Sequence, residues 1–209
     1  MIAIFQWFVR ITGWIVQWCA FRTKIYYEDK KVQSRHIKGG AIIVSNHTSV
    51  YDYAVYLFVF YRILRYLMAE ILYTRRGLKT FLKMMGGIYV NRNTHDLSFL
   101  DKSNEVINKG GVVGTFPESR IPKPEEEKPL EFKQSVILLA LQSKAPIIPC
   151  ATNGSYFKKK RARVIIGKPF NAFDYYDITK TEKENVTNIT NLLRDRIIEL
   201  KGKLDGQKK

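Results

Sequence analysis

Residues 42–52, IIVSNHTSVYD, begin with an apolar run and continue with mostly polar residues. Three β-branched residues predict a short buried strand, and the polar Ser45 and Asn46 indicate its end. His47 follows at once, and Asp52 comes after four intervening residues. If a helix begins behind this loop, Asp52 can face the imidazole, fix its tautomer and leave the other ring nitrogen as a base. The alternative is a surface histidine beside an aspartate that only caps a helix.

Length and composition indicate one globular domain with an unusual charge. The chain has 209 residues, of which 45% are hydrophobic and 26% charged, which is typical of a folded protein with a single core. Its net charge of +16 attracts nucleic acid, anionic lipid or phosphorylated substrates. Two cysteines, Cys19 and Cys150, are too few for a disulfide framework and lack metal-ligand spacing, which favours a reducing, cytosol-facing location.

The first 21 residues, MIAIFQWFVRITGWIVQWCAF, contain all three tryptophans and interrupt their apolar run with Gln6 and Arg10. A signal peptide has its charge before the apolar core, and a spanning helix needs about 20 apolar residues. We therefore predict that residues 1–22 form an amphipathic helix anchored in the membrane interface, followed by a domain over residues 23–209. A buried core helix and a single membrane span are the alternatives.

Apolar runs and helical patterns alternate along the rest of the chain, which predicts an α/β sheet. Its strands end in His47, Arg92 and the pair Glu118 and Arg120, and we expect these groups at one edge, where such sheets bind ligands. In the predicted helix 181–200, Thr181 and Glu184 form a capping box at the N-terminus. The predicted strands cover 24–28, 42–47, 88–90, 112–116, 146–151 and 164–166, and the predicted helices 53–73, 96–109, 133–143 and 181–200.

Two polar segments admit two interpretations each. Residues 121–128, rich in proline and glutamate, are either a lid over the proposed site or a solvated loop. Residues 158–163, KKKRAR, are the densest basic run of the chain. They suit nucleic acid or anionic lipid head groups, and no recognised nucleic-acid motif accompanies them.

Four blocks in order identify a resemblance. NHTSVYD (46–52) matches a histidine, four residues and an aspartate, and GIYVNR (87–92) resembles the second block of the same family. FPESR (116–120) resembles a third block that usually reads FPEGTR, and IIP (147–149) resembles the fourth. Over roughly residues 25–170 the chain thus resembles the glycerolipid acyltransferase family, in particular its 1-acyl-sn-glycerol-3-phosphate (lysophosphatidic acid) acyltransferases.

The resemblance implies a single α/β domain with a mixed, partly parallel sheet flanked by helices, preceded by a membrane-associated helix. It implies that His47 and Asp52 are catalytic, and that the substrate is bound by Arg92, Glu118, Ser119 and Arg120. The acyl donor would be acyl-CoA or acyl carrier protein, with no cofactor and no metal. The acceptor would be lysophosphatidic acid, and the product phosphatidic acid.

The same resemblance places the protein on the cytoplasmic face of an anionic cell membrane, peripheral or monotopic, with no nucleic-acid partner. Two departures concern the acceptor. The third block lacks the glycine and is one residue shorter before Arg120, and Glu70 stands near a position where many relatives have a lysine. Arg75 and Arg76 are candidates to replace that lysine. Glycerol 3-phosphate or another lysophospholipid is the alternative acceptor, and a basic protein that binds lipid or nucleic acid without activity is the other alternative.

Overall fold

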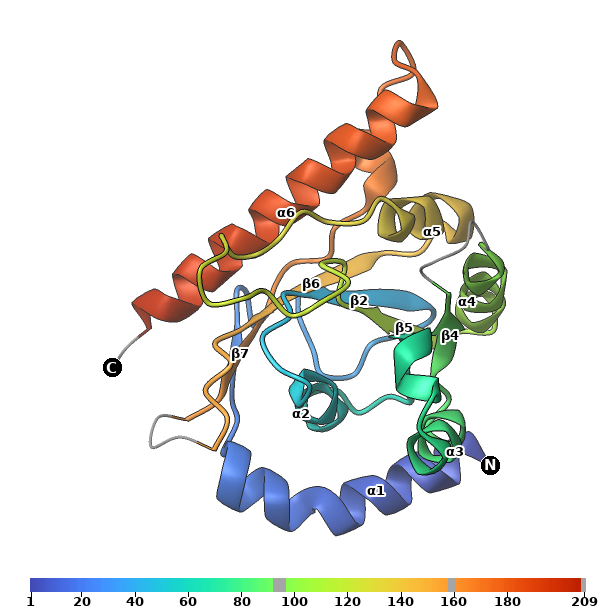
Figure 1. The fold of residues 1–209 in the computed structure, drawn as a ribbon. Helices are drawn as coiled ribbons and strands as arrows, with labels where there is room; N and C mark the ends of the chain where they lie inside the picture. The colour runs from blue at the N-terminus through green and yellow to red at the C-terminus, as the bar shows by residue number, and fades with distance from the viewer. Residues whose placement is uncertain (92–96, 158–160, 208–209) are drawn as a thin grey trace.

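A seven-stranded sheet forms the centre of the molecule in the computed structural model, which describes residues 1–91, 97–157 and 161–207 (Figure 1). β6 and β7 are antiparallel, and the other neighbouring strands are parallel. The predicted mixed, partly parallel sheet is therefore confirmed. In spatial order the strands are β1 (Lys24–Tyr27), β7 (Arg163–Ile166), β6 (Ile147–Thr152), β2 (Ala41–Ser45), β5 (Val112–Thr115), β3 (Leu64–Ala69) and β4 (Ile88–Val90).

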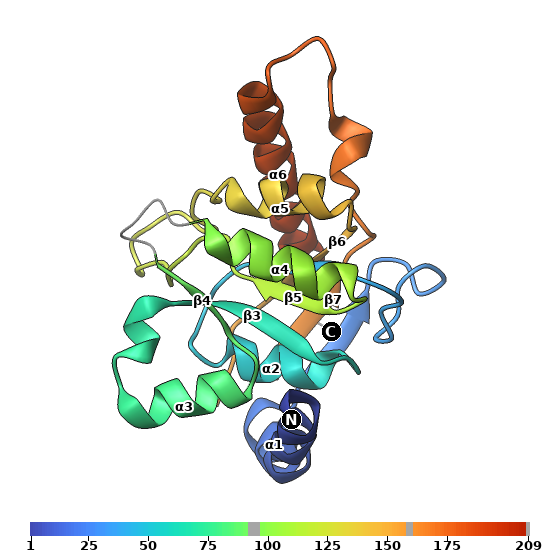
Figure 2. The ribbon, with the colours of Figure 1, turned by 90° about the vertical axis from the view of Figure 1, so that its right-hand side faces the viewer.

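Helices cover both faces of this sheet (Figures 1 and 2). On one face lie α4 (Ser98–Asn108), α5 (Ser135–Ser143) and α6 (Glu182–Gly206), and on the other α2 (Asp52–Val59) and α3 (Arg76–Met84). α1 (Ile2–Val16) lies beyond α2, on the side away from the sheet, and continues into a π-helical turn, Gln17–Phe21. Short 3-10 helices cover Glu70–Tyr73 and Ala172–Tyr175.

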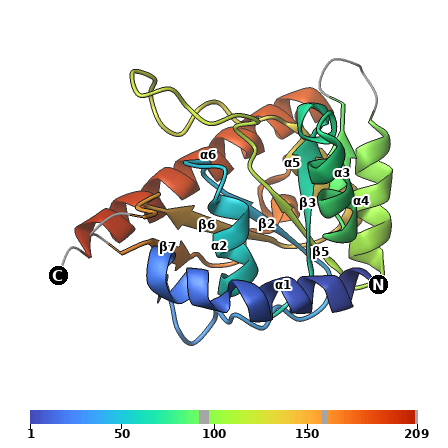
Figure 3. The same cartoon turned by 60° about the horizontal axis from the view of Figure 1, so that its bottom comes forward.

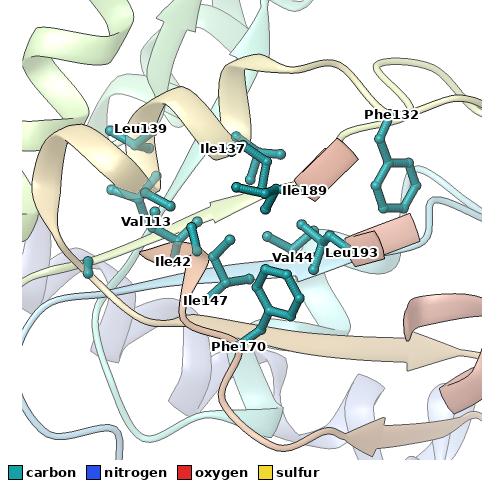
Figure 4. Packing of buried hydrophobic residues seen from close by; sticks show 14 of the residues in the cluster. Ile42, Val44, Val113, Phe132, Ile137, Leu139, Ile147, Phe170, Ile189 and Leu193 are labelled. Carbon is teal, nitrogen blue, oxygen red and sulfur yellow. The ribbon is translucent and has the colours of Figure 1, made fainter. Parts of the chain in front are cut away.

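The strand that leads to His47 is buried on both faces, as expected for a central strand of a mostly parallel sheet. Because side chains alternate along a strand, Ile42 and Val44 pack beneath α5 and α6, where Figure 4 shows Ile42 beside Val113 and Val44 beside Leu193. Ala41 and Ile43 pack against the opposite layer. The position of His47 is thus fixed from both sides of the sheet.

The C-terminal helix begins as predicted. The Thr181 hydroxyl accepts a hydrogen bond from the backbone N–H of Glu184, and the Glu184 carboxylate accepts one from the backbone N–H of Thr181. The predicted apolar stripe is buried against the sheet and comprises Val186, Ile189, Leu193, Ile197 and Leu200.

The prediction of one helix over residues 53–73 is wrong. α2 ends at Val59, and the chain then turns into β3, which lies between β5 and β4. Two arginines distant in sequence bind the carbonyls that end α2: Arg35 Nε donates to Val59 O (2.7 Å), and Arg10 Nη2 donates to Phe60 O (3.1 Å). These contacts and the pairing of β3 are tertiary, so the local apolar pattern could not reveal them.

α1 confirms the predicted N-terminal helix, and it buries polar side chains while exposing apolar ones. Gln6 is fully buried: its Nε2 donates to Leu64 O and Met85 O (both 2.7 Å), and its Oε1 accepts from Leu64 N (3.1 Å). Arg10 is buried beside it. Across the described ranges no helix is both long enough and apolar enough to span a membrane. The exposed apolar side chains of α1 and the turn after it are Ile4, Trp7, Phe8, Ile11, Trp14, Ile15, Val16 and Trp18.

Candidate active site

The histidine and aspartate of the first block meet as their spacing predicted. His47 follows β2, and Asp52 is the first residue of α2. His47 Nδ1 lies 2.8 Å from Asp52 Oδ2. Because an ionised carboxylate only accepts hydrogen bonds, this contact holds the proton on Nδ1 and leaves Nε2 with its lone pair.

Asp52 is fully buried and is held by backbone and hydroxyl donors. Its Oδ2 accepts from the backbone N–H groups of Thr48 (2.6 Å) and Ser49 (2.9 Å), and its Oδ1 accepts from the Thr48 hydroxyl (2.8 Å). These hydrogen bonds offset the cost of burying the charge and fix the direction in which the carboxylate faces His47.

Tyr156 is a further partner of Asp52 that the sequence analysis missed. Its hydroxyl donates to Asp52 Oδ1 at 2.6 Å and lies 3.0 Å from Thr152 Oγ1. Burial raises the pKa of Tyr156, and the adjacent Asp52 raises it further, so the phenol remains a proton donor. Tyr156 lies 104 residues beyond Asp52 and outside the four blocks, so no spacing pattern connects the two.

The imidazole of His47 stacks on Phe116, with ring centroids 4.5 Å apart and an interplanar angle of 11°. Its side chain is 19% exposed, and no group in the described part of the chain hydrogen-bonds to Nε2. The stacked ring fixes the plane of the imidazole, while the hydrogen bond to Asp52 fixes its rotation. His47 is therefore held in one orientation with its basic nitrogen available.

His47 lines a cavity of about 760 Å³, which we call the apolar cavity. Its walls come from α1, α2, β3, α3 and the loops after β2 and β5, and most of its lining side chains are apolar. Val9 and Val16 of α1 line it together with Leu57 of α2. A cavity of this size and composition suits a hydrocarbon chain beside the basic nitrogen.

Glu118 lies behind His47. Its carboxylate accepts from the backbone N–H of His47 (2.6 Å, Oε1) and of Leu130 (2.9 Å, Oε2), and the residue is buried. Burial raises the pKa of Glu118, although both hydrogen bonds act in the opposite direction. The carboxylate thus ties the loop after β2 to the loop after β5, and Glu118 is not among the residues that line the apolar cavity.

Ser119 and Arg120 do line that cavity. Ser119 has φ 64°, in the left-handed region, and it stands where the third block usually has glycine, the residue that adopts this conformation most easily. Arg120 is exposed and forms a two-pronged ion pair with Glu126 of the loop 121–128, Nη1 to Oε2 at 2.7 Å and Nη2 to Oε1 at 2.6 Å. That loop has no regular secondary structure.

Arg92 lies outside the described residues, as do His95 and Lys158–Lys160 of the basic run. β4, the strand before Arg92, ends at Val90 and runs parallel to β3, which is parallel to β5. It therefore ends at the same edge of the sheet as the strands before His47 and Phe116. Within the ranges that the structure describes, no group of three or more His, Cys, Asp or Glu side chains is placed to hold a metal ion.

Fold and site together define an α/β enzyme with a buried His–Asp pair beside an apolar cavity. The chain belongs to the Acyltransferase family, whose model matches residues 24–153. The resemblance found in the four blocks is therefore confirmed at the level of the family.

Named relatives agree with this assignment. A 1-acyl-sn-glycerol-3-phosphate acyltransferase of Bacillus subtilis (strain 168) is 29% identical over 147 residues, which are 68% of this chain and 71% of that protein. One of Borreliella burgdorferi is 24% identical over 166 residues, 77% of this chain and 66% of that protein. The fold resembles the crystal structure of the 1-acyl-sn-glycerophosphate (LPA) acyltransferase PlsC of Thermotoga maritima, with a TM-score of 0.66, 17% identity, and coverage of 96% of this chain and 79% of that one.

Proposed function

We propose that this protein transfers a fatty acyl group from an acyl thioester to the free hydroxyl of lysophosphatidic acid, giving phosphatidic acid. The observation that carries the proposal is the His47–Asp52 pair, whose free nitrogen is available beside an apolar cavity. Two named relatives are 1-acyl-sn-glycerol-3-phosphate acyltransferases, which supports this acceptor. The thioester is that of coenzyme A or of acyl carrier protein.

In this mechanism His47 Nε2 accepts the proton of the acceptor hydroxyl while its oxygen attacks the thioester carbonyl carbon. The tetrahedral intermediate collapses by breaking the carbon–sulfur bond, and the departing thiolate takes the proton from His47. Asp52 keeps the tautomer and stabilises the transient imidazolium. No serine or cysteine nucleophile is needed, because the acceptor hydroxyl is the nucleophile.

The remaining site residues bind and position the substrates. The fatty acyl chain occupies the apolar cavity, and Arg92 binds the acceptor's phosphate together with Ser119 and Arg120. For Arg120 to take part, the phosphate must replace Glu126 on its guanidinium. Glu118 acts through the backbone of His47, because its carboxylate is bound to that N–H group.

The membrane part of the proposal rests on α1. Residues 1–22 serve as a monotopic anchor in the cytoplasmic leaflet, and residues 23–209 as the acyltransferase domain. The buried contacts of Gln6 and Arg10 attach the polar side of the helix to the domain, which leaves its apolar side for lipid. Exposed tryptophans such as Trp7 and Trp14 suit the interface between head groups and acyl chains.

The test is product identification by mass spectrometry with detergent-purified protein. Lysophosphatidic acid, glycerol 3-phosphate and lysophosphatidylcholine are offered separately, each with acyl-CoA and with acyl carrier protein as donor. We expect phosphatidic acid from lysophosphatidic acid. Acylation of a different acceptor alone would retain the chemistry and reject this substrate, and no product from any combination would reject the proposed activity.

A further inference from the structure

A second cavity, of about 540 Å³, lies at the edge of the sheet near β4, and we call it the basic cavity. It is bounded by α4, the end of α3, the turn before β4, the start of β3 and the first residue of α1. None of the described residues lines both this cavity and the apolar cavity. A volume of this order accommodates a small polar ligand.

The basic cavity is separate from the His47 site. Gly111, which lines it, directly precedes β5, whereas Phe116, which stacks on His47, directly follows that strand. Four residues of strand rise by about 13 Å, so the Gly111 end of the basic cavity lies far from His47. Its other end reaches Tyr89 of β4, whose strand neighbour Met68 lines the apolar cavity. A ligand at the Gly111 end is therefore distinct from the acceptor under His47.

Cationic side chains from three elements converge on this cavity. Arg65 comes from β3, Lys83 from α3 and Lys102 from α4, and Lys109 directly follows α4. Lys109 Nζ lies 2.5 Å from the carboxylate of Glu105, which is the acidic side chain among the described lining residues.

The other three cations are not neutralised in this way. Arg65, Lys83 and Lys102 form no hydrogen bond and no close ion pair with any residue that the structure describes. The hydrogen bond from Lys109, and more weakly the charge of Arg65, lower the pKa of Glu105, so Arg65 acts on this carboxylate only from a greater distance. Like charges around one cavity repel each other, and an anion in the centre relieves that repulsion. A phosphate group offers the oxygen acceptors that guanidinium and ammonium groups bind.

The basic cavity borders the exposed apolar surface. Ile2 of α1 lines it, and a Cβ atom on Gly86 of the cavity wall would lie 2.8 Å from Ile2 Cγ2, so the start of α1 packs directly against this wall. Next to Lys83, the side chains of Phe81 and Met84 are exposed. Figure 3 shows α1 running along one side of the molecule, and Figure 1 shows its N-terminal end beside α3. Cations at the rim of an apolar surface are the arrangement that binds anionic membranes.

We propose that the basic cavity binds the phosphate of an anionic phospholipid head group, as a lipid site additional to the acceptor site. The inference rests on the proposed docking of α1 on the membrane, which brings Ile2 and Lys83 to the level of the head groups. Phosphate in this cavity holds the N-terminal end of α1 against anionic lipid. Free phosphate has the same chemistry, and the experiment separates the two sources.

The test is lysine footprinting, in which acetylation of each lysine is measured by mass spectrometry. The protein is mixed with vesicles of phosphatidylcholine alone, with vesicles containing 20% phosphatidylglycerol, or with inorganic phosphate in the absence of lipid. We expect acetylation of Lys83 and Lys102 to fall at least threefold more with phosphatidylglycerol than without it, while Lys180 and Lys183 near the start of α6 are unchanged. Equal acetylation of Lys83 and Lys102 in both vesicles would overturn the proposal.

Tryptophan fluorescence in the same samples reports docking of α1 independently. A blue shift in both vesicle types without protection of the lysines refutes the lipid site and keeps the docking. If no shift occurs in either, docking fails, and protection by inorganic phosphate alone would then show a phosphate site that does not select lipid. Protection only with lipid supports the proposal as stated.

Paired variants sharpen the result. K83Q/K102Q should weaken binding to the phosphatidylglycerol vesicles about tenfold, since a basic residue near an anionic surface contributes strongly. K180Q/K183Q removes the same charge near the start of α6, a helix that lies on the opposite side of the molecule from α1 (Figure 1), and its binding should change less than about twofold. Equal losses in the two variants would show that only the overall charge attracts the membrane.

Discussion

Asp52 accepts five hydrogen bonds within the described part of the chain while being fully buried. Three come from backbone and side-chain groups of Thr48 and Ser49, one from His47 and one from Tyr156. The loop after β2 thus supplies most of the hydrogen-bond donors around Asp52, and Tyr156, in the loop after β6, supplies the remaining one. These donors determine which way the carboxylate of Asp52 faces, and therefore the orientation of the His47 imidazole.

Tyr156→Phe should lower kcat about tenfold with little effect on KM, because a hydrogen bond to a buried charged group contributes roughly 1.5–3 kcal/mol. Steady-state kinetics with each substrate varied in turn separates the effect on kcat from the effect on KM. Tyr66→Phe is the matched control, since the buried Tyr66 hydroxyl has no hydrogen-bond partner among the described residues. A kcat in Tyr156→Phe equal to that of the Tyr66→Phe control would contradict a positioning role.

Glu126→Gln should lower the KM for lysophosphatidic acid about threefold, because Glu126 occupies the guanidinium that the phosphate is proposed to bind. The hydrogen bond from Arg120 lowers the pKa of Glu126 to about 2, so the pair persists across assay pH. Glu125→Gln removes the same charge from an exposed neighbour and serves as control. A higher KM in Glu126→Gln would mean instead that Glu126 positions Arg120 for the substrate.

At the scale of elements, α1 is attached to the domain by its polar side. The buried amide of Gln6 satisfies three backbone groups at the start of β3 and the end of α3, and Arg10 reaches the carbonyl groups that follow α2. The helix also forms a wall of the apolar cavity. Docking of this element and completion of the apolar cavity are therefore linked.

Gln6→Leu should lower the free energy of unfolding by about 3 kcal/mol, because it leaves the buried backbone groups of Leu64 and Met85 without partners. Chemical denaturation measures the loss. Ile11→Gln changes an exposed apolar residue of the same helix and should leave stability unchanged while weakening vesicle binding. Stability losses of equal size in both variants would contradict a packing in which α1 buries Gln6 and exposes Ile11.

Sequence patterns predicted most elements, because β1, β2, β4 to β7, α4, α5 and α6 each carry a local period or a cap. The helix predicted over 53–73 failed because Arg35 and the strands beside β3 act from elsewhere in the chain. In the site, spacing predicted the contact of His47 with Asp52, whereas Tyr156 had no pattern to reveal it. The structure places Glu118 behind His47, a position that the four blocks did not distinguish from direct contact with substrate.

At the scale of the whole molecule, the sheet separates two surfaces. α6 lies on one side, and α1 with its exposed apolar residues lies on the other (Figure 1). Ion pairs join α6 to the edge of the sheet, where Glu28 contacts Lys203 (2.7 Å) and Arg196. Charged contacts thus hold α6 to the β1 side of the sheet, whereas α1 carries exposed apolar side chains on the other side of the molecule.

The Glu28 contacts should make the free energy of unfolding depend on pH in the acid range. Burial alone would raise the pKa of Glu28, but hydrogen bonds from Lys203, the Lys168 N–H and Arg196 lower it to about 2. Its contribution is complete above the unfolded pKa of 4.5 and is lost as the pH falls toward 2. Between these values the wild-type protein should lose about 1 kcal/mol more stability than Glu28→Gln, because its partners are partly exposed. Identical acid titrations of the two proteins by denaturation would refute this.

The most direct test of the proposed chemistry is thiol release from acyl-CoA with lysophosphatidic acid, compared between the wild-type protein and His47→Ala. Loss of a positioned base should lower kcat about a thousandfold, while circular dichroism and the unfolding midpoint stay close to those of the wild type. Acceptor-dependent release by the wild type and its loss in a folded His47→Ala would support His47 as the base. Release at the wild-type rate in His47→Ala would contradict it.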